Sequence, residues 1–287
     1  MQHSATVTFS DETAGLSGTS PGVPARRWGK LLRSVLVRGL SLILSLVLWQ
    51  TASVKKWDVF VHFENVPPPT AVAESAVQLF QSPKFVSHVR NSVFRVFVGF
   101  SIATVLAVLL GLIIGRFRIV ADFLLPPLEI LRPIPAVAWI PLAILMFSTA
   151  EQSMIYITFI GAFFPILLST IHGVENIDQR LVFASLTLGT GPLALFREVI
   201  FPGALPSIVT GLSIGMGTSW FSLVTAEMVS GQFGIGYYTW EAYTLQDYPD
   251  IVLGMISIGV LGMGSSLLIK LIGHRLMPWF QPGANAA

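Results

Sequence analysis

The sequence lacks several features that soluble enzymes and secreted domains use. It contains no cysteine, which excludes disulfides, thiolate metal ligands and cysteine nucleophiles. Charged residues make up only 11% of the 287 residues, and the net charge of +2 is too small to indicate binding to nucleic acid. The spacing of the five histidines forms no metal-binding cluster. We therefore expect no metal ligands, no catalytic residues and no nucleic-acid partner.

Apolar side chains are abundant instead. They make up 53% of the chain, and the mean hydropathy of +0.72 lies outside the range of ordinary soluble domains. Several segments exceed the roughly 18 apolar residues that cross a hydrocarbon core about 30 Å thick. Because lipid offers no partner for backbone polar groups, such segments are helical. The sequence therefore predicts an all-α, polytopic membrane protein.

Six apolar runs predict about six transmembrane helices. Their approximate ranges are residues 31–51, 89–114, 131–147, 152–171, 208–230 and 251–272. Together they form a transmembrane domain over residues 26–280. Residues 1–25, rich in Ser, Thr, Gly and Pro, predict a disordered cytoplasmic tail, and residues 281–287 form a short C-terminal tail.

The distribution of basic residues predicts the orientation. An even number of spans puts both termini on one side, and placing that side in the cytoplasm puts eleven of the seventeen Lys and Arg residues inside. Lys55, Lys56 and Lys84 run against this assignment. A competing interpretation treats residues 26–53 as a cleaved secretory signal, which would leave five spans. We expect a multi-pass protein of the bacterial inner membrane with both termini cytoplasmic.

A polar segment between the fourth and fifth runs, residues 172–206, carries a spaced motif. Gly189 is followed thirteen residues later by Pro202, and Val199, Phe201 and Pro202 stand where an Ile-x-Leu-Pro ending would stand. The segment resembles the cytoplasmic EAA loop of ABC-importer permeases. It departs from that motif at its start, where Phe183, Ala184 and Ser185 replace Glu-Ala-Ala.

Other segments extend the resemblance over roughly residues 66–280. They are Leu131-Arg132-Pro133-Ile134-Pro135, Ala138-Trp139-Ile140-Pro141-Leu142, Ala226-Glu227-Met228 and Gly234-Ile235-Gly236-Tyr237. Their order is similar to that in the nitrate, sulfonate, taurine and bicarbonate permease group. The resemblance implies a type I ABC-importer permease fold with a cytoplasmic coupling helix.

The same resemblance implies how the loop works. In the family, a short coupling helix docks in a groove of the ATPase. Gly189 would permit a turn between two helical pieces, Ala184 and Ser185 would give a small docking surface, and Pro202 would help to set the start of the fifth span. The neighbouring charges of Arg197 and Glu198 are candidates for ion pairs.

The family also implies partners. No Gly-x-x-x-x-Gly-Lys-Ser/Thr motif occurs in the chain, so we expect no cofactor here, with ATP and Mg²⁺ bound by a separate ATPase subunit. The implied assembly contains a second copy of the chain, two ATPase subunits and a periplasmic or lipid-anchored substrate-binding protein, surrounded by membrane lipid. The implied substrate is a small oxyanion: an aliphatic sulfonate, taurine, nitrate or bicarbonate.

Charged residues within the predicted spans are candidates for a translocation path or gate. Glu227 lies close to the outer end of the fifth span, where a buried carboxylate needs compensation, and Arg95 lies at comparable depth in the second span. This pair either locks two helices or lines the substrate path. Glu129 and Arg132, three residues apart, either pair near an inner gate or reach water at the interface.

Four uncharged residues are further candidates for lining the path, because hydroxyl and indole groups can donate hydrogen bonds to oxyanions. They are Trp139, Trp220, Ser222 and Thr225. The alternative is helix packing. Five prolines between Pro126 and Pro141 predict a span broken into pieces, as found beside cavities: Pro126, Pro127, Pro133, Pro135 and Pro141.

Two other functions are considered. A secondary transporter or channel driven by an ion gradient would need intramembrane relay residues, and only Glu227 and Arg95 qualify. Residues 211–215 fit the hydrolase pattern Gly-x-Ser-x-Gly, but they lie inside a predicted membrane helix rather than a strand–turn–helix. Their glycines, like Gly111 and Gly115, have the spacing that permits close helix contact.

Overall fold

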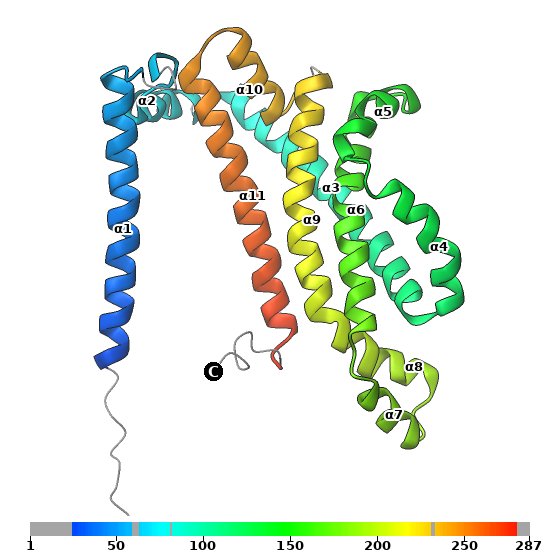
Figure 1. Cartoon of the computed structure of the whole chain (residues 1–287). Helices are drawn as coiled ribbons and strands as arrows, with labels where there is room; N and C mark the ends of the chain where they lie inside the picture. Colours follow the sequence, from blue (N-terminus) through cyan, green and yellow to red (C-terminus); the bar gives the residue numbers. More distant parts are fainter. Residues whose placement is uncertain (1–24, 59–62, 81, 231–232, 280–287) are drawn as a thin grey trace, which may run out of the picture. The chain divides into compact units, whose positions relative to one another are not determined.

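The computed structural model describes residues 25–58, 63–80, 82–230 and 233–279, and the regular elements there are helices (Figure 1). The chain divides into two compact units, residues 1–51 and 52–287. The first contains most of α1, Ala25–Val54, whose part from Val35 is apolar and long enough to span a membrane. Residues 1–24 and 280–287, which hold most of the predicted N-terminal tail and the whole C-terminal tail, lie outside the described residues.

The second unit contains the remaining helices. Its α-helices are α2 Pro69–Phe80, α3 Pro83–Arg116, α4 Arg118–Leu131, α5 Ile140–Met146, α6 Ala150–Glu175, α7 Gln179–Thr187, α8 Pro192–Leu195, α9 Phe201–Ser230, α10 Ile235–Thr244 and α11 Tyr248–Leu276. Short 3₁₀ helices cover Phe63–Asn65 and Ala136–Trp139, and a π-helical turn, Phe196–Ile200, leads directly into α9. Helices α7 and α8 lie at one end of this unit, called the loop end; α10 lies at the other, called the far end (Figure 1).

Five of the six predicted spans are confirmed as helices long and apolar enough to cross a membrane, namely α1, α3, α6, α9 and α11. The third predicted span, residues 131–147, is not one continuous helix. That stretch holds the end of α4, a turn and the short helix α5, and the helical segments on either side of the turn are bent by 83°. The described residues therefore contain five spans, or six if this bent pair counts as one.

Only some of the prolines cause this bend. Pro126 and Pro127 lie inside α4, which continues through them. The helix ends at Leu131, just before Pro133 and Pro135, where two missing N–H groups within three residues leave a continuing helix without its hydrogen bonds. The break thus falls near the middle of the proline-rich segment 126–141, rather than at its start at Pro126 and Pro127.

Helix α6 is the centre of the second unit, because it packs along both α3 and α9. Glycines on α3 and α9 allow these helices to pack closely against α6. A Cβ added at Gly111 would lie 2.7 Å from Thr170 Cβ, and one at Gly211 would lie 2.5 Å from Ser169 Cβ. The predicted close packing at the Gly111/Gly115 and Gly211/Gly215 pairs is confirmed, since a Cβ at any of these positions would lie 2.8 Å or less from a side chain of α6.

This packing gives a test on two glycines of α9. Alanine at Gly211 would force α9 away from Ser169, which we expect to cost about 1–3 kcal/mol of stability. Alanine at Gly217, which has nothing within 4 Å in the described residues, should instead gain up to about 1 kcal/mol of helix propensity. Thermal unfolding in detergent should therefore move the two midpoints in opposite directions. Equal shifts would contradict the α6–α9 contact.

Candidate functional site

A buried ion-pair cluster joins three spans near the far end. Arg95 of α3 contacts Glu227 of α9 through Nη1 and Oε1 at 2.9 Å, and Glu151 of α6 through Nη2 and Oε2 at 2.7 Å. Its Nη1 also donates to the carbonyl of Phe233. The Arg95–Glu227 pair predicted from sequence is confirmed. Glu151 was missed, because the sequence places it at the start of a helix, beyond an N-capping threonine, rather than at membrane depth.

Hydrogen bonds satisfy the Glu227 carboxylate, whose side chain is 0% exposed. Its Oε1 also accepts from Ser92 Oγ at 2.7 Å, and its Oε2 accepts from the Gly236 amide at 2.9 Å. A Cβ at Gly234 would lie 2.2 Å from Glu227 Cδ, so only glycine fits there. The motif Gly-Ile-Gly thus wraps the carboxylate, which explains why it follows Glu227 so closely in the sequence.

This geometry favours a structural role for the pair. Each Glu227 oxygen has protein partners, and the cluster ties α3, α6 and α9 to the chain that enters α10. Buried charges without water are stable only when paired and hydrogen-bonded in this way. Of the two interpretations left open by the sequence, the helix lock therefore has the support of the contacts.

Aromatic side chains close the far end. His88 of α3 lies among Phe233, Tyr237 and Tyr238, with ring centroids 5.6–6.1 Å apart, and its Nδ1 accepts from the Gly234 amide at 3.0 Å. On α10, burial raises the pKa of Tyr238, and the carboxylate of Asp250 raises it further. Tyr238 therefore stays protonated even at alkaline pH.

A pocket of about 390 Å³ lies midway between the two ends. The turn after α4, the middle of α6 and the middle of α9 line it. Arg132 contributes the positive charge, and Ser222 and Thr218 contribute hydroxyls, whereas Phe164 and Phe221 give apolar walls. No carboxylate lines this pocket among the described residues.

Only some of the residues predicted for a translocation path line this pocket. Arg132 and Ser222 line the pocket together, and Thr218, one turn before Ser222, was missed. Glu129 is exposed and forms no ion pair with Arg132 in the described residues. The others do not line it: Trp220 donates from Nε1 to Ser265 Oγ of α11 at 3.0 Å, Trp139 packs against the core at the far end, and Thr225 donates to the Phe221 carbonyl at 2.9 Å.

The loop between α6 and α9 folds into two short helices joined by a tight turn. Asp178 caps α7 by accepting from the Arg180 amide at 2.9 Å. Gly189 has φ +77°, the left-handed conformation that ends helices and favours glycine. Pro192 then starts α8, where the missing N–H has no cost. The predicted turn at Gly189 is confirmed, and the loop between the two long helices is shorter than the predicted 172–206, because α6 continues to Glu175 and α9 begins at Phe201.

The loop presents an apolar face while its second half is anchored. One side of α7 carries Leu181, Ala184 and Ser185, and Leu188, the residue that directly follows the helix, continues this side and is 86% exposed. Phe183, Leu186 and Leu193 are exposed nearby. By contrast, Leu195 and Ile200 are buried in a cluster with Leu112 of α3, Val174 of α6 and both Ala204 and Ile208 of α9.

The second half of the loop contains Arg197, Glu198 and Pro202, for which the sequence predicted ion pairs and a helix start. Arg197 and Glu198 are both exposed, and neither forms an ion pair in the described residues. Pro202 is the second residue of α9, and its missing N–H falls directly after the π-helical turn Phe196–Ile200. The Phe196–Ile200 turn just before it is π-helical, which sequence patterns do not reveal.

Comparison with known proteins decides the family. A family model described as a binding-protein-dependent transport system inner membrane component matches residues 104–283, more than half of the chain. The chain belongs to this family. The permease is 34% identical over 233 residues to the nitrate import permease protein NrtB of Synechocystis sp., covering 77% of this chain and 85% of the relative. It is 36% identical over 191 residues to the bicarbonate transport system permease protein CmpB of Synechococcus elongatus, covering 66% of each.

A solved structure supports the fold of the permease. The crystal structure of a bacterial ABC transporter involved in the import of the acidic polysaccharide alginate matches with a TM-score of 0.52 and 16% identity, covering 90% of this chain and 100% of that chain. With the family match, this identifies the permease as a multi-pass inner-membrane subunit of an ABC importer. Its family consists of the membrane components of such transporters, which work with ATPase and substrate-binding subunits.

The buried cluster predicts a stability difference. Arg95→Met leaves Glu227 charged in a fully buried site, and we expect a loss of about 3–5 kcal/mol. Adding Glu227→Leu should recover most of it, because both charges are then replaced by apolar groups. Glu151→Gln is the control, since the Glu151 side chain is 43% exposed and should cost less than about 1 kcal/mol. Unfolding midpoints in detergent check the series, and an Arg95→Met midpoint at or above the control would contradict the cluster.

Proposed function

We propose that this permease moves a small oxyanion, such as nitrate, bicarbonate, an aliphatic sulfonate or taurine, across the inner membrane. The observation that carries the proposal is the pocket around Arg132. It offers one guanidinium and two hydroxyls midway through the membrane, with no carboxylate in its lining among the described residues. The guanidinium fork matches the planar oxygens of nitrate, bicarbonate and sulfonate.

The names of two relatives agree with this substrate class. One is a nitrate import permease and the other a permease of a bicarbonate transport system. A single positive charge in an otherwise neutral pocket suits a transported ion, because binding must be weak enough for release. Arg132 would therefore attract the anion, and the hydroxyls of Ser222 and Thr218 would replace part of its hydration shell.

Two copies of the permease would enclose the path. One copy alone leaves the second half of α9 uncovered on one side, where Gly217 and Phe221 are exposed, and the Arg132 pocket adjoins this side through Thr218 and Phe221. A second copy facing the same side would close a path with both arginines beside it. We therefore propose a homodimer as the translocating unit.

The loop end would couple this path to ATP hydrolysis. We assign it to the cytoplasm, with both termini on the same side, from the excess of Lys and Arg there. An ATPase subunit, which would bind ATP and Mg²⁺, would dock on the α7 stripe formed by Leu181, Ala184, Ser185 and Leu188. Because Leu195 and Ile200 are buried against α3, α6 and α9 at the loop end, movement of the loop would be transmitted to α9. A binding protein would deliver the anion at the far end.

Docking on α7 gives the first functional test. Leu188→Glu places a charge in the proposed interface, and we expect partner binding and ATP-driven uptake to fall at least tenfold. Leu188 is 86% exposed, so the fold should be unaffected. Gln179→Glu is the matched control, because it adds the same charge on the opposite side of α7. Gly189 is unsuitable for this purpose, since its φ of +77° makes any side chain strain the turn.

The experiment uses the permease reconstituted with its ATPase and binding protein in vesicles. Coupled uptake that is equal in the two variants would contradict docking on this stripe. Uptake that follows an imposed ion gradient without ATPase would instead favour a secondary transporter.

Arg132 gives a test of the substrate path. Arg132→Gln should lower the uptake of nitrate or bicarbonate about tenfold or more, since a hydrogen bond to a charged group is worth about 1.5–3 kcal/mol. Arg132→Lys should keep part of the rate, and Arg118→Gln, at the other end of α4, should keep all of it. ATPase binding should be unchanged in each variant. Normal uptake by Arg132→Gln would show that the anion does not pass this residue.

A further inference from the structure

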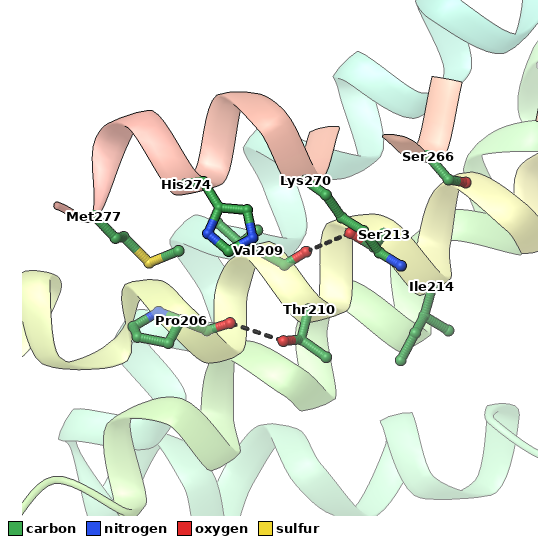
Figure 2. Close-up of a pocket in the computed structure, with 9 residues that line it drawn as sticks. All are labelled: Pro206, Val209, Thr210, Ser213, Ile214, Ser266, Lys270, His274 and Met277. Atoms are coloured by element: carbon green, nitrogen blue, oxygen red, sulfur yellow. Dashed lines mark hydrogen bonds between the residues drawn. The ribbon is translucent and has the colours of Figure 1, made fainter. Parts of the chain in front are cut away.

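A second pocket, of about 450 Å³, lies near the loop end between the first half of α9 and the last turns of α11 (Figure 2). Lys270 and His274 of α11 line one side, and Thr210 and Ser213 of α9 line the other. Close contacts between α9 and α11 border the pocket. Gly273 meets Val209 so closely that a Cβ would lie 2.4 Å from Val209 Cγ1, and Trp220 is hydrogen-bonded to Ser265 deeper in the membrane. The pocket is therefore part of the packed arrangement of the two helices.

Lys270 is the unusual member of this pocket. It lies six residues before the end of α11, about 9 Å inside a helix long and apolar enough to span the membrane. It is exposed and forms no ion pair in the described residues. A lone ammonium at this depth is costly, and its flexible stem lets it reach toward the headgroup layer. What it lacks there is a counter-anion.

The lining matches the two parts of a phospholipid. Figure 2 shows Lys270 and His274 on successive turns of α11, facing the hydroxyl-bearing turns of α9. Thr210 and Ser213 donate to the carbonyls of Pro206 and Val209, both at 2.9 Å, so their hydroxyl oxygens remain acceptors for an ammonium or imidazole N–H. Deeper in the membrane, Ile214 is 52% exposed. The wall thus carries basic side chains and hydroxyls, flanked by an apolar side chain toward the membrane centre at Ile214 and another toward the loop end at Met277.

We propose that this pocket binds an anionic phospholipid, with its phosphate between Lys270 and His274 and an acyl chain along α9 and α11. The leaflet follows from the proposed function, which puts the loop end in the cytoplasm. The inner leaflet carries anionic lipid, and basic pockets between spans on that side bind such headgroups. Because α9 continues directly from the coupling loop, the lipid would contact the same helix that the ATPase moves.

Native mass spectrometry of the full-length permease in detergent tests this proposal. Phosphatidylglycerol should bind more tightly than phosphatidylcholine with the same acyl chains. Lys270→Gln should weaken phosphatidylglycerol binding about fivefold, which corresponds to about 1 kcal/mol for one basic residue near the surface. Lys270→Arg should retain it. Arg275→Gln is the matched control, because it removes an exposed charge from the same helix end without lining the pocket.

Equal binding of the two lipids, or equal loss in Lys270→Gln and Arg275→Gln, would overturn the proposal. Inorganic phosphate that binds with the same dependence on Lys270 and displaces phosphatidylglycerol would assign the pocket to a free anion and also overturn it. The measurement needs neither ATPase nor substrate. A negative result here leaves the proposed transport function intact, and failure of the Leu188 or Arg132 tests leaves the lipid site intact.

Discussion

The contact of α6 with α3 and α9 is the constraint on which the rest of the permease depends. Lipid is as apolar as leucine, so spans associate through close packing rather than through the hydrophobic effect. Glycines at 111 and 115 on α3, and at 211 and 215 on α9, bring the backbones close to α6. Both pockets, the ion-pair cluster and the anchored half of the loop take their positions from this arrangement.

Charge within the membrane is used sparingly and in distinct ways. Arg95 is neutralised by two carboxylates on two other helices, so its charge fixes helix positions. Arg132 and Lys270 have no ion-pair partner in the described residues, and each lines a pocket. A basic side chain within the spans therefore fixes helix positions where it is paired, and we propose that it binds an anion where it is not.

Much of this could be predicted from sequence, for identifiable reasons. Long apolar runs specify α3, α6, α9 and α11, and the depth of Arg95 and Glu227 in their spans was enough to pair them. The position of the bend was not predictable, because Pro126 and Pro127 look the same in sequence as Pro133 and Pro135, yet only the second pair coincides with the break. Trp220 and Ser222 are two residues apart in one helix, and only the packing of α9 shows that one faces α11 and the other the pocket.

The π-helical turn at Phe196–Ile200 has an evolutionary consequence. A π-turn holds one residue more than an α-turn, so it sets how the α7–α8 loop and the side of α9 that carries Thr218 and Ser222 are rotated relative to each other. Loss of that residue would turn α9 by about 100° and carry Thr218 and Ser222 away from the pocket. Under the proposed function, insertions and deletions in this turn would therefore change the lining of the anion's path without altering any residue of that lining.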